Sequence, residues 1–257
     1  MALPNTAPSE EAGATPAAEL PGQLPRTSAH DVVMHEGSRS ARLREIKLLI
    51  DGRLRLGLRA TFTRYGLRRD LAVPITNPNA KVPISVRPLE PSDLPILLSE
   101  NNHLEPQERV QIAWRKDFYK KAPEGCWVAV DERSGTPCYM QWLFGASENP
   151  LIRTFGGFPR LEPDEALLEN AYTPVACRGL GIMSAAMALI AERAAEIGAQ
   201  KVLTFVGDDN IGSLKGCQRA GFHPDLLNKR VRLLYGTINS DTFETLPADD
   251  PRRTLQF

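Results

Sequence analysis

Residues 172–184 read YTPVACRGLGIMS and join a strand-like run to a helix-like run. Gly179 and Gly181 let the backbone turn tightly and come close to a ligand. The unpaired N–H groups and the positive dipole end of the following helix point into this loop, and Arg178 adds a charge-assisted donor. These features predict an anion site, most naturally for a pyrophosphate, although an RGxG loop by itself also occurs as a plain strand-to-helix turn.

A second segment, NIGSLKGCQRAGF at 210–222, predicts a short helix that closes at Gly221. The rest of the chain alternates between strand-like and helix-like runs. Strands are expected at 84–89, 166–173, 201–207 and 229–236 and twice in the hairpin 126–146, and helices at 93–100, 105–122, 182–197 and 210–220. The order β-α-α-β-β-β-α-β-α-β indicates an α/β (α+β) fold, a mixed sheet with helices on both faces.

The composition restricts the function classes. The 257 residues hold 31 Lys and Arg and 31 Asp and Glu, a balance that argues against nucleic acid as a partner. No run approaches about 18 apolar residues, so no transmembrane helix is expected, and the first residues lack a secretory signal. The four cysteines form no CxxC and no metal-ligand spacing with the histidines, so we expect a cytoplasmic protein without a metal.

The chain divides into five predicted parts. These are a disordered Pro/Ala-rich tail (1–30), a basic amphipathic helical segment (31–71), a linker (72–81), a catalytic domain (82–236) and a loosely attached C-terminal tail (237–257). Within the second part, residues 39–69 carry ten Lys and Arg but only two acidic residues.

Apolar residues recur every four positions in this basic segment, at Ile50, Leu54, Leu58 and Phe62, which predicts an amphipathic basic helix. Such a helix would lie peripherally on an anionic membrane, or its apolar stripe would pack on the catalytic domain or a second subunit. Both alternatives stay open, and with them a homo-oligomer.

The two motif segments together resemble the GNAT N-acetyltransferase superfamily over roughly residues 82–236. The family's first motif, [Gln/Arg]-x-x-Gly-x-[Gly/Ala], is similar to RGLGIM at 178–183. A second motif runs from an Asn to a Gly-Phe pair and is matched by Asn210 and Gly221–Phe222. The run ISVRPLEPSDLPILL also looks like the family's opening strand and helix.

The resemblance implies a mostly antiparallel sheet whose central strand, 166–173, splays from strand 201–206. It further implies that an acyl-CoA lies in the gap, with its pantetheine on the open backbone of the central strand and its pyrophosphate on the loop amides. The cofactor-binding residues that it implies are Tyr172, Thr173, Arg178, Gly179, Leu180, Gly181, Ile182, Met183, Ser184, Asn210 and Ser213.

Two positions depart from the family's pattern. Met183 stands where the first motif has Gly or Ala, and its side chain fits the apolar stripe of its helix, so we expect it to be buried. Cys217 stands where many members carry a Tyr that protonates the departing CoA thiolate. A thiol has a suitable pKa for that role, although buried cysteines are usually packing residues and solvent is an alternative acid.

An ammonium acceptor must lose a proton before it attacks a thioester. Glu169, on the central strand with the same parity as Thr173, is the first candidate base, and a surface or ion-paired carboxylate is the alternative interpretation. Glu165 and Asp164 are the next candidates. His103 and His223 fit solvated or packing positions better. The Gly-containing loop 147–165 is expected to shape the acceptor pocket or act as a lid, or else simply to connect two elements.

The sequence therefore predicts an acetyltransferase that moves an acetyl group from acetyl-CoA directly to an amine, most readily on a small molecule. One alternative is a longer acyl-CoA. Another is a module of the same fold that binds CoA or a partner without catalysis. A sugar amine, an antibiotic, an amino acid and a protein amine all remain open as acceptors.

Overall fold

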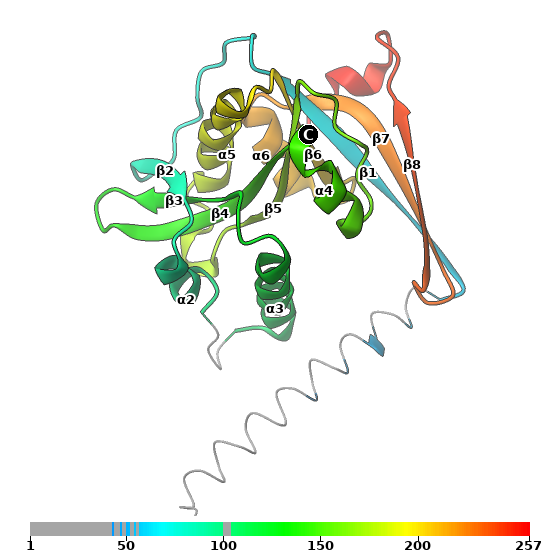
Figure 1. Ribbon diagram of the computed structural model, residues 1–257, viewed down its shortest axis with the longest axis horizontal. Helices are drawn as coiled ribbons and strands as arrows, with labels where there is room; N and C mark the ends of the chain where they lie inside the picture. Colours follow the sequence, from blue (N-terminus) through cyan, green and yellow to red (C-terminus); the bar gives the residue numbers. More distant parts are fainter. Residues whose placement is uncertain (1–42, 44–46, 48–49, 52–53, 55–56, 100–103) are drawn as a thin grey trace, which may run out of the picture. The chain divides into compact units, whose positions relative to one another are not determined.

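The computed structural model of the protein describes residues 43, 47, 50, 51, 54, 57–99 and 104–257. The strands of this region form one sheet with eight strands, in the order β2-β3-β4-β5-β6-β1-β7-β8 (Figure 1). Only β5 and β6 pair in parallel, and the other neighbours are antiparallel. The predicted mixed, mostly antiparallel sheet is confirmed.

From residue 84 to residue 233 the elements follow the predicted order, apart from an additional helix at Asn149–Phe155 and a last predicted strand that begins at His223 instead of residue 229. The strands are β1 (Arg59–Asp70), β2 (Ile84–Pro88), β3 (Cys126–Asp131), β4 (Thr136–Gly145), β5 (Glu165–Tyr172), β6 (Lys201–Gly207), β7 (His223–Leu233) and β8 (Ile238–Thr245). The helices are α2 (Leu94–Leu97), α3 (Pro106–Lys121), α4 (Asn149–Phe155), α5 (Ile182–Arg193) and α6 (Ile211–Arg219), with short 3₁₀ turns between them.

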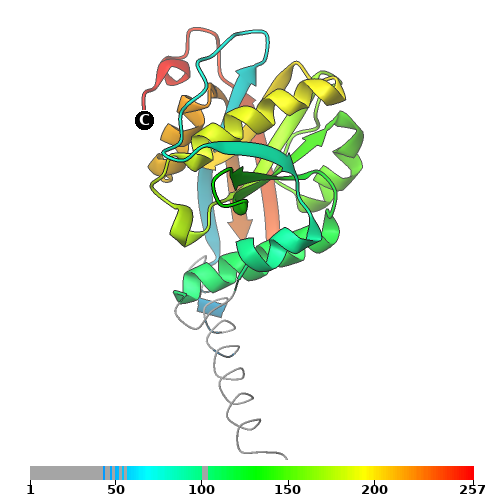
Figure 2. The same cartoon turned by 90° about the vertical axis from the view of Figure 1, so that its left-hand side faces the viewer.

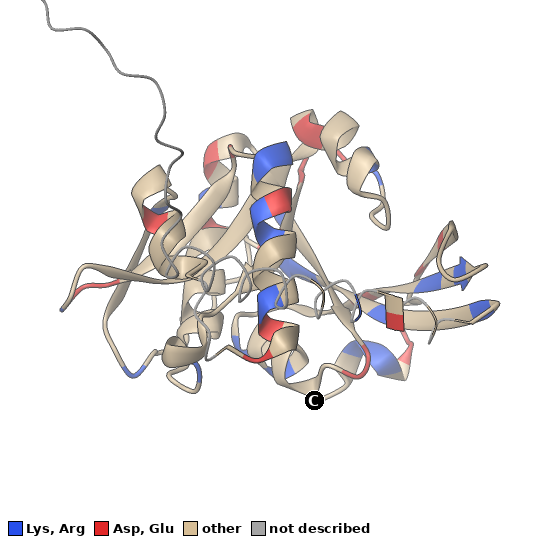
Figure 3. Cartoon of the chain, turned by 90° about the horizontal axis from the view of Figure 1, so that it is seen from below, with Lys and Arg blue, Asp and Glu red and all other residues tan. Residues whose placement is uncertain are grey.

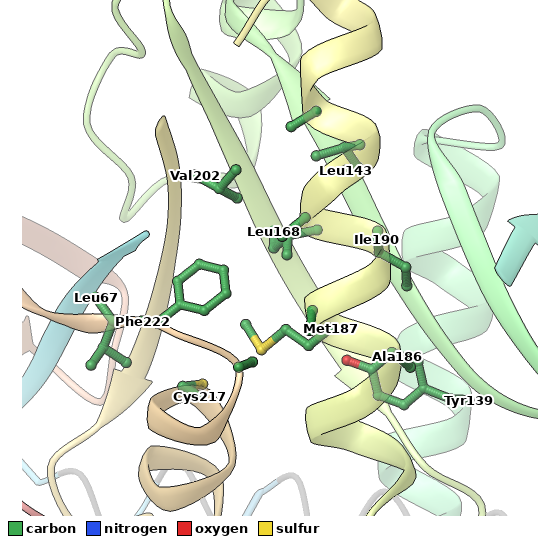
Figure 4. Packing of buried hydrophobic residues seen from close by; sticks show 14 of the residues in the cluster. Leu67, Tyr139, Leu143, Leu168, Ala186, Met187, Ile190, Val202, Cys217 and Phe222 are labelled. Atoms are coloured by element: carbon green, nitrogen blue, oxygen red, sulfur yellow. The ribbon is translucent and has the colours of Figure 1, made fainter. Parts of the chain in front are cut away.

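Helices flank the sheet on both faces, and each face has its own hydrophobic core (Figures 1 and 2). On one face α5 and α6 bury residues such as Ile190, Leu214 and Phe222 against the strands (Figure 4). On the other face α2, α3 and α4 bury Leu97, Phe118 and Ile152 together with Trp142 of β4 and neighbouring side chains. The sheet thus separates an α5/α6 face from an α3/α4 face.

The central strands part from one another as predicted. β5 pairs with β6 over only three positions, from Glu165 opposite Lys201 to Leu167 opposite Leu203. Beyond them β5 continues to Tyr172 and β6 to Gly207 without pairing. This leaves a gap in the middle of the sheet, because β4 stays paired to β5 on one side and β1 to β6 on the other.

The prediction of a helix across residues 59–69 is wrong. The described residues up to Leu54 are helical, but residues 59–70 form β1, which lies between β6 and β7. A spacing of four also fits a strand, since every second residue of a strand faces the same side. Thr61 and Thr63 favour the extended conformation, and Gly57, at φ +59°, separates the helical residues from the strand.

The C-terminal segment is likewise part of the sheet and not a loose tail. β8 pairs with β7 over eight positions. Beyond it Leu246 is buried, and the ring of Phe257 lies 5.3 Å from that of Tyr65. Strand INSDTFET lies at the sheet edge with mostly exposed residues, so it lacks the apolar alternation that marks a strand in a sequence.

The predicted loop 147–165 and the predicted N-terminal tail remain to be compared with the structure. The loop 147–165 contains the helix α4, which its short apolar run LIRTF did not reveal. The predicted tail 1–30 lies outside the described residues, as does most of the helical half of the basic segment. None of the helices in the described part of the chain has the length and hydropathy needed to cross a bilayer.

Candidate active site

The RGLG loop has the geometry expected of an anion site. Gly179 and Gly181 take φ values of +76° and +74°, in the left-handed region that favours glycine. Gly181 immediately precedes α5, and no side chain caps that helix start. The first amides of α5 are therefore available to an anion at the positive end of the helix dipole.

The segment predicted as a linker, residues 72–81, packs against this loop. The amide of Lys81 donates to the carbonyl of Leu180 at 2.8 Å. A Cβ on Gly181 would lie 3.2 Å from the carbonyl oxygen of Asn79. Leu180 contacts the core of the α5/α6 face, and so it holds the loop in place from its inner side.

A cavity of about 570 Å³ brings the two sequence motifs together. Ten of the eleven predicted cofactor-binding residues line it, and Leu180 is the exception. The predicted residues that line it are Tyr172, Thr173, Arg178, Gly179, Gly181, Ile182, Met183, Ser184, Asn210 and Ser213. Arg115 and Tyr139 also line the cavity and were not predicted.

Met183 fits this site because α6 makes room for it. A Cβ on Gly216 of α6 would lie 3.2 Å from the sulfur of Met183 and 3.5 Å from Oγ of Ser184. The side chain is half-buried, packs against the α5/α6 core and also lines the cavity, so the expected burial of Met183 is met only in part. At the start of α6, Oδ1 of Asn210 accepts from the amide of Ser213 at 3.1 Å and caps the helix.

Arg178 is held by a carboxylate on α3. Its Nη2 lies 2.6 Å from Oε1 of Glu108, and its Nε donates to the carbonyl of Thr173 at 3.0 Å. The hydroxyl of Tyr172 donates to the same Glu108 oxygen at 2.9 Å. Glu108 thus ties α3 to the end of β5 and to the anion loop.

Arg115 adds a buried positive charge to the cavity wall. Its guanidinium lies 4.4 Å from the centre of the Tyr172 ring and donates to the carbonyl of Ala171 at 3.0 Å. Its Nε is buried, and among the described residues nothing accepts a hydrogen bond from it. Burial, as the largest cause, lowers the pKa of Arg115 to about 10.

A bulge in β5 decides which way Glu169 points. Glu169 lies opposite Trp142, but the next pair is Tyr172 opposite Met140, and Asn170 between them has a φ of +60°. Side chains of directly opposed residues share a face. Glu169 therefore faces the α3/α4 side together with Tyr172, and the predicted parity with Thr173 does not hold across the bulge.

The sequence profile of the Acetyltransferase (GNAT) family matches residues 93–222, which include both motifs. The chain belongs to the GNAT acetyltransferase family. No curated protein matches it.

Several solved structures are similar to this GNAT protein at low identity. A GCN5-related N-acetyltransferase from Sphaerobacter thermophilus is 15% identical, with a TM-score of 0.41, over 69% of this chain and 55% of that one. One from Kribbella flavida is 13% identical, with a TM-score of 0.41, over 66% and 58%. The glucosamine N-acetyltransferase region of a fungal multi-domain β-N-acetylglucosaminidase is 15% identical, with a TM-score of 0.46, over 65% and 20%.

At these identities and TM-scores, the similar structures do not indicate the substrate. The family assignment rests on the sequence profile alone. The matched region spans little more than half of the two bacterial chains and a fifth of the fungal one. What this GNAT protein acts on must therefore come from its own site.

Glu169, the first candidate base, lies on the α3/α4 side of β5 and is not among the residues that line the cavity. Its side chain is half-buried. Burial raises the pKa of Glu169 to about 7, against the opposing positive charges of Arg64, Arg230 and Arg115. A carboxylate with a pKa near the working pH accepts a proton most effectively.

The other candidate bases lie elsewhere. Glu165 and Asp164 are at the paired start of β5, where Glu165 lies 2.7 Å from Arg68 and Asp164 lies 2.9 Å from Lys201. Neither lines the cavity. His223 is exposed at the start of β7, and His103 lies outside the described residues.

Cys217 does not occupy a position that supports the general-acid role. It is buried in the α5/α6 core beside Met187 and Phe222 and does not line the cavity (Figure 4). Burial raises the pKa of the Cys217 thiol to about 12. The interpretation as a packing residue fits this position.

Sequence reasoning missed the charged residues around Glu169. Arg64 was assigned to a helix that is in fact β1, and Arg230 belongs to a strand that carried no motif. Arg115 and Glu108 are polar residues of an amphipathic helix, for which exposure is the usual expectation. The one available signal is the density of arginines, since four of the residues in β1 are Arg.

Proposed function

We propose that this GNAT protein transfers an acetyl group from acetyl-CoA directly to the amine of a small molecule. One observation carries the proposal: the gap between β5 and β6 has the anion loop on one side of the sheet and Glu169 on the other. A donor held on the α5/α6 face would present its thioester at the gap. An acceptor amine would reach it from the α3/α4 face.

The chain's own residues supply each part of the chemistry. The loop amides and Arg178 would bind the pyrophosphate, and the open edge of β5 near Tyr172 and Thr173 would bind the pantetheine. Glu169 would take a proton from the acceptor ammonium, and the free amine nitrogen would then attack the thioester carbonyl carbon. The C–S bond breaks as the new C–N bond is completed, without an acyl-enzyme intermediate.

Arg115 would stabilise the negative charge that develops in this step. It is buried and lines the cavity beside Ala171 and Tyr172, where a positive charge is little screened. The departing thiolate would take its proton from solvent, since Cys217 lies in the core. This assignment needs no metal, and the described ranges hold no cluster of three or more metal-ligating side chains.

The cysteines bear on where the protein works. All four, Cys126, Cys138, Cys177 and Cys217, are free. Free thiols persist in a reducing compartment, which supports the cytoplasm as the place of action. We further propose that the described part of the basic segment serves the fold, since Arg68 pairs with Glu165 and Asp225 inside the domain.

Titration calorimetry with acetyl-CoA tests the proposal. The Arg178→Ala variant is expected to bind acetyl-CoA about tenfold to hundredfold more weakly, because a charge-assisted hydrogen bond to phosphate is lost. The control is Arg193→Ala, which removes an exposed arginine at the C-terminal end of α5, far from the loop. This variant should bind acetyl-CoA like the wild type. Thiol release in the presence of amines then measures the transfer itself.

Each alternative gives a different result. Binding of acetyl-CoA without release of the CoA thiol in the presence of any amine would indicate a binding module without catalysis. If the CoA thiol is released from a longer acyl-CoA but not from acetyl-CoA, the donor is the longer acyl-CoA. Equal binding by the wild type and Arg178→Ala would remove Arg178 from the cofactor site.

A further inference from the structure

Two arginines from neighbouring strands, Arg64 and Arg230, meet at the loop residue Gly157, and the charge of each acts on Glu169. Arg64 of β1 donates from Nε to Oδ1 of Asn228 at 2.9 Å, and its Nη2 donates to the carbonyl of Gly157. A Cβ on Gly157 would collide with the guanidinium of Arg230 and lie 3.3 Å from Nη2 of Arg64. The two guanidiniums therefore converge on one loop.

The positive charge of this cluster exceeds its negative charge. Asp241 is shared between two arginines, at 2.8 Å from Nε of Arg230 and 3.6 Å from Nη1 of Arg232. Arg64 has no carboxylate within ion-pairing distance among the described residues. Three guanidiniums thus face one ion-paired carboxylate, and one positive charge remains even when the charge of Glu169 is counted.

The guanidiniums are partly removed from water. Arg64 lies between the rings of Phe158 and Phe205, at 5.3 Å and 5.2 Å from their centres. Burial, followed by the charge of Arg230, lowers the pKa of Arg64 to about 10. Keeping two such cations close together in a half-buried place is costly unless an anion joins them.

Room for a small molecule lies next to this cluster. A cavity of about 650 Å³ runs along α4 and β8, and Gly157, Phe158, Asp241 and Phe243 are part of its wall. Figure 3 shows basic residues on the strands that project beyond the helices on this part of the molecule. The loop that contacts both arginines thus also bounds a space for the body of a ligand.

We propose that the acceptor carries a carboxylate on the same molecule as its amine, and that Arg64 and Arg230 bind this carboxylate so that the amine faces Glu169. An amino acid has this chemistry. A guanidinium presents its donors in a planar fork that matches a carboxylate, and the remaining positive charge calls for an anion. The inference rests on the proposed function, because an acceptor is defined only by the acetyl transfer. The binding of a carboxylate can nevertheless be measured without turnover.

The test compares amino acids with their own carboxamides. The protein loaded with CoA is titrated by calorimetry with a panel of L-amino acids and the matched carboxamides, which keep the amine and the side chain but lose the charge. At least one amino acid is expected to bind about tenfold to hundredfold more tightly than its carboxamide. Arg230→Gln and Arg64→Gln should each abolish most of that preference.

The controls separate this result from misfolding and from a failed function. Lys229→Gln changes an exposed cation on the opposite face of β7 and should keep the preference. Because Arg64 is packed in a central strand, its variant is used only if its circular dichroism matches that of the wild type, and Arg230→Gln stands as the independent test. If thiol release fails while the preference is present, the acetyl transfer is wrong and the carboxylate site remains.

Two outcomes overturn the inference. In the first, no amino acid in the panel binds better than its carboxamide. In the second, a preference exists but survives in Arg230→Gln and in a folded Arg64→Gln. Inorganic phosphate is titrated in parallel, and tighter binding of phosphate than of every amino acid would also overturn the assignment to a carboxylate.

Discussion

The two sides of the gap between β5 and β6 are built in different ways. The proposed donor side is formed mainly by the loop before α5 and the start of α6, and most of its residues fall in 172–184 and 210–216. The proposed acceptor side is made of side chains from β1, β5 and β7 together with the loop after α4. Arg64 and its hydrogen-bond partner Asn228 are 164 residues apart in the sequence.

This difference has a chemical reason. A pyrophosphate can be bound by consecutive amides at a helix start, which a few adjacent residues supply. A base with a raised pKa and an anion-binding pair of arginines need burial and convergence, which arise only when distant strands come together. We therefore expect variants on the two sides to separate donor binding from acceptor chemistry.

The largest expected effect is on the acceptor side, at Glu169. Glu169→Gln should lower kcat about 100- to 1000-fold, because the ammonium then has no base. In the wild type, kcat/KM should rise with pH and level off above about 7, since only ionised Glu169 accepts the proton. In the variant this step in the pH profile should disappear while the Kd for acetyl-CoA stays within about twofold.

Stability supplies the control for this variant. The pKa of Glu169 is raised in the folded chain, so the favourable contribution of its neutral form is present at low pH and is lost as the pH rises through about 7. Glu169→Gln should therefore unfold at the same or a higher temperature than the wild type at pH 8. Glu162→Gln, an exposed change just before β5, should alter neither kcat nor the pH profile. A pH step that persists in Glu169→Gln would assign the base to another residue.

A smaller effect is expected at the loop that contacts the two arginines. Gly157→Ala would place a methyl group against Arg230 and Arg64 and would strain a residue at φ +76°. The KM for the acceptor should rise about tenfold, and acetyl-CoA binding should not change, because a shifted guanidinium loses a charge-assisted contact. Steady-state kinetics with each substrate varied in turn measures both constants.

Gly156→Ala is the matched control for that change. Gly156 also has a positive φ, at +66°, but a Cβ there meets nothing within 4 Å. It should carry the same cost in backbone strain without displacing the arginines, so the acceptor KM should stay near that of the wild type. If both variants raise the acceptor KM equally, strain in the loop and not the position of the arginines sets acceptor binding.

The same contrast explains how far the sequence could be interpreted. Most strands and helices between residues 84 and 233 and most residues of the donor side were predicted, because glycine turns, helix starts and apolar periodicity are local signals, whereas α4 and the first half of β7 were not predicted. β1 was missed, since its four-residue spacing fits a helix as well as a strand and its place between β6 and β7 depends on pairing with residues far along the chain. The convergence of Arg64 and Arg230 on the loop at Gly157 follows from that pairing and has no local signal.

The smallest expected effect is at Glu108, which lies on α3 of the α3/α4 face but contacts the anion loop of the donor side. This carboxylate of α3 binds Arg178 of the donor loop at 2.6 Å, so it competes with a pyrophosphate for that guanidinium and repels the phosphate charge. Glu108→Gln should therefore tighten acetyl-CoA binding by about twofold to fivefold, the opposite sign to Arg178→Ala. The gain should shrink as salt is added, because the exposed Arg178 is screened.

Calorimetry at two ionic strengths tests this, with Glu105→Gln as the control, since that exposed residue lies one turn earlier and pairs with no arginine of the loop. Weaker binding by Glu108→Gln would mean that Glu108 holds Arg178 in its binding position instead of competing for it. In that case the two sides of the gap would not be independent, because a helix of the acceptor face would preorganise the donor loop.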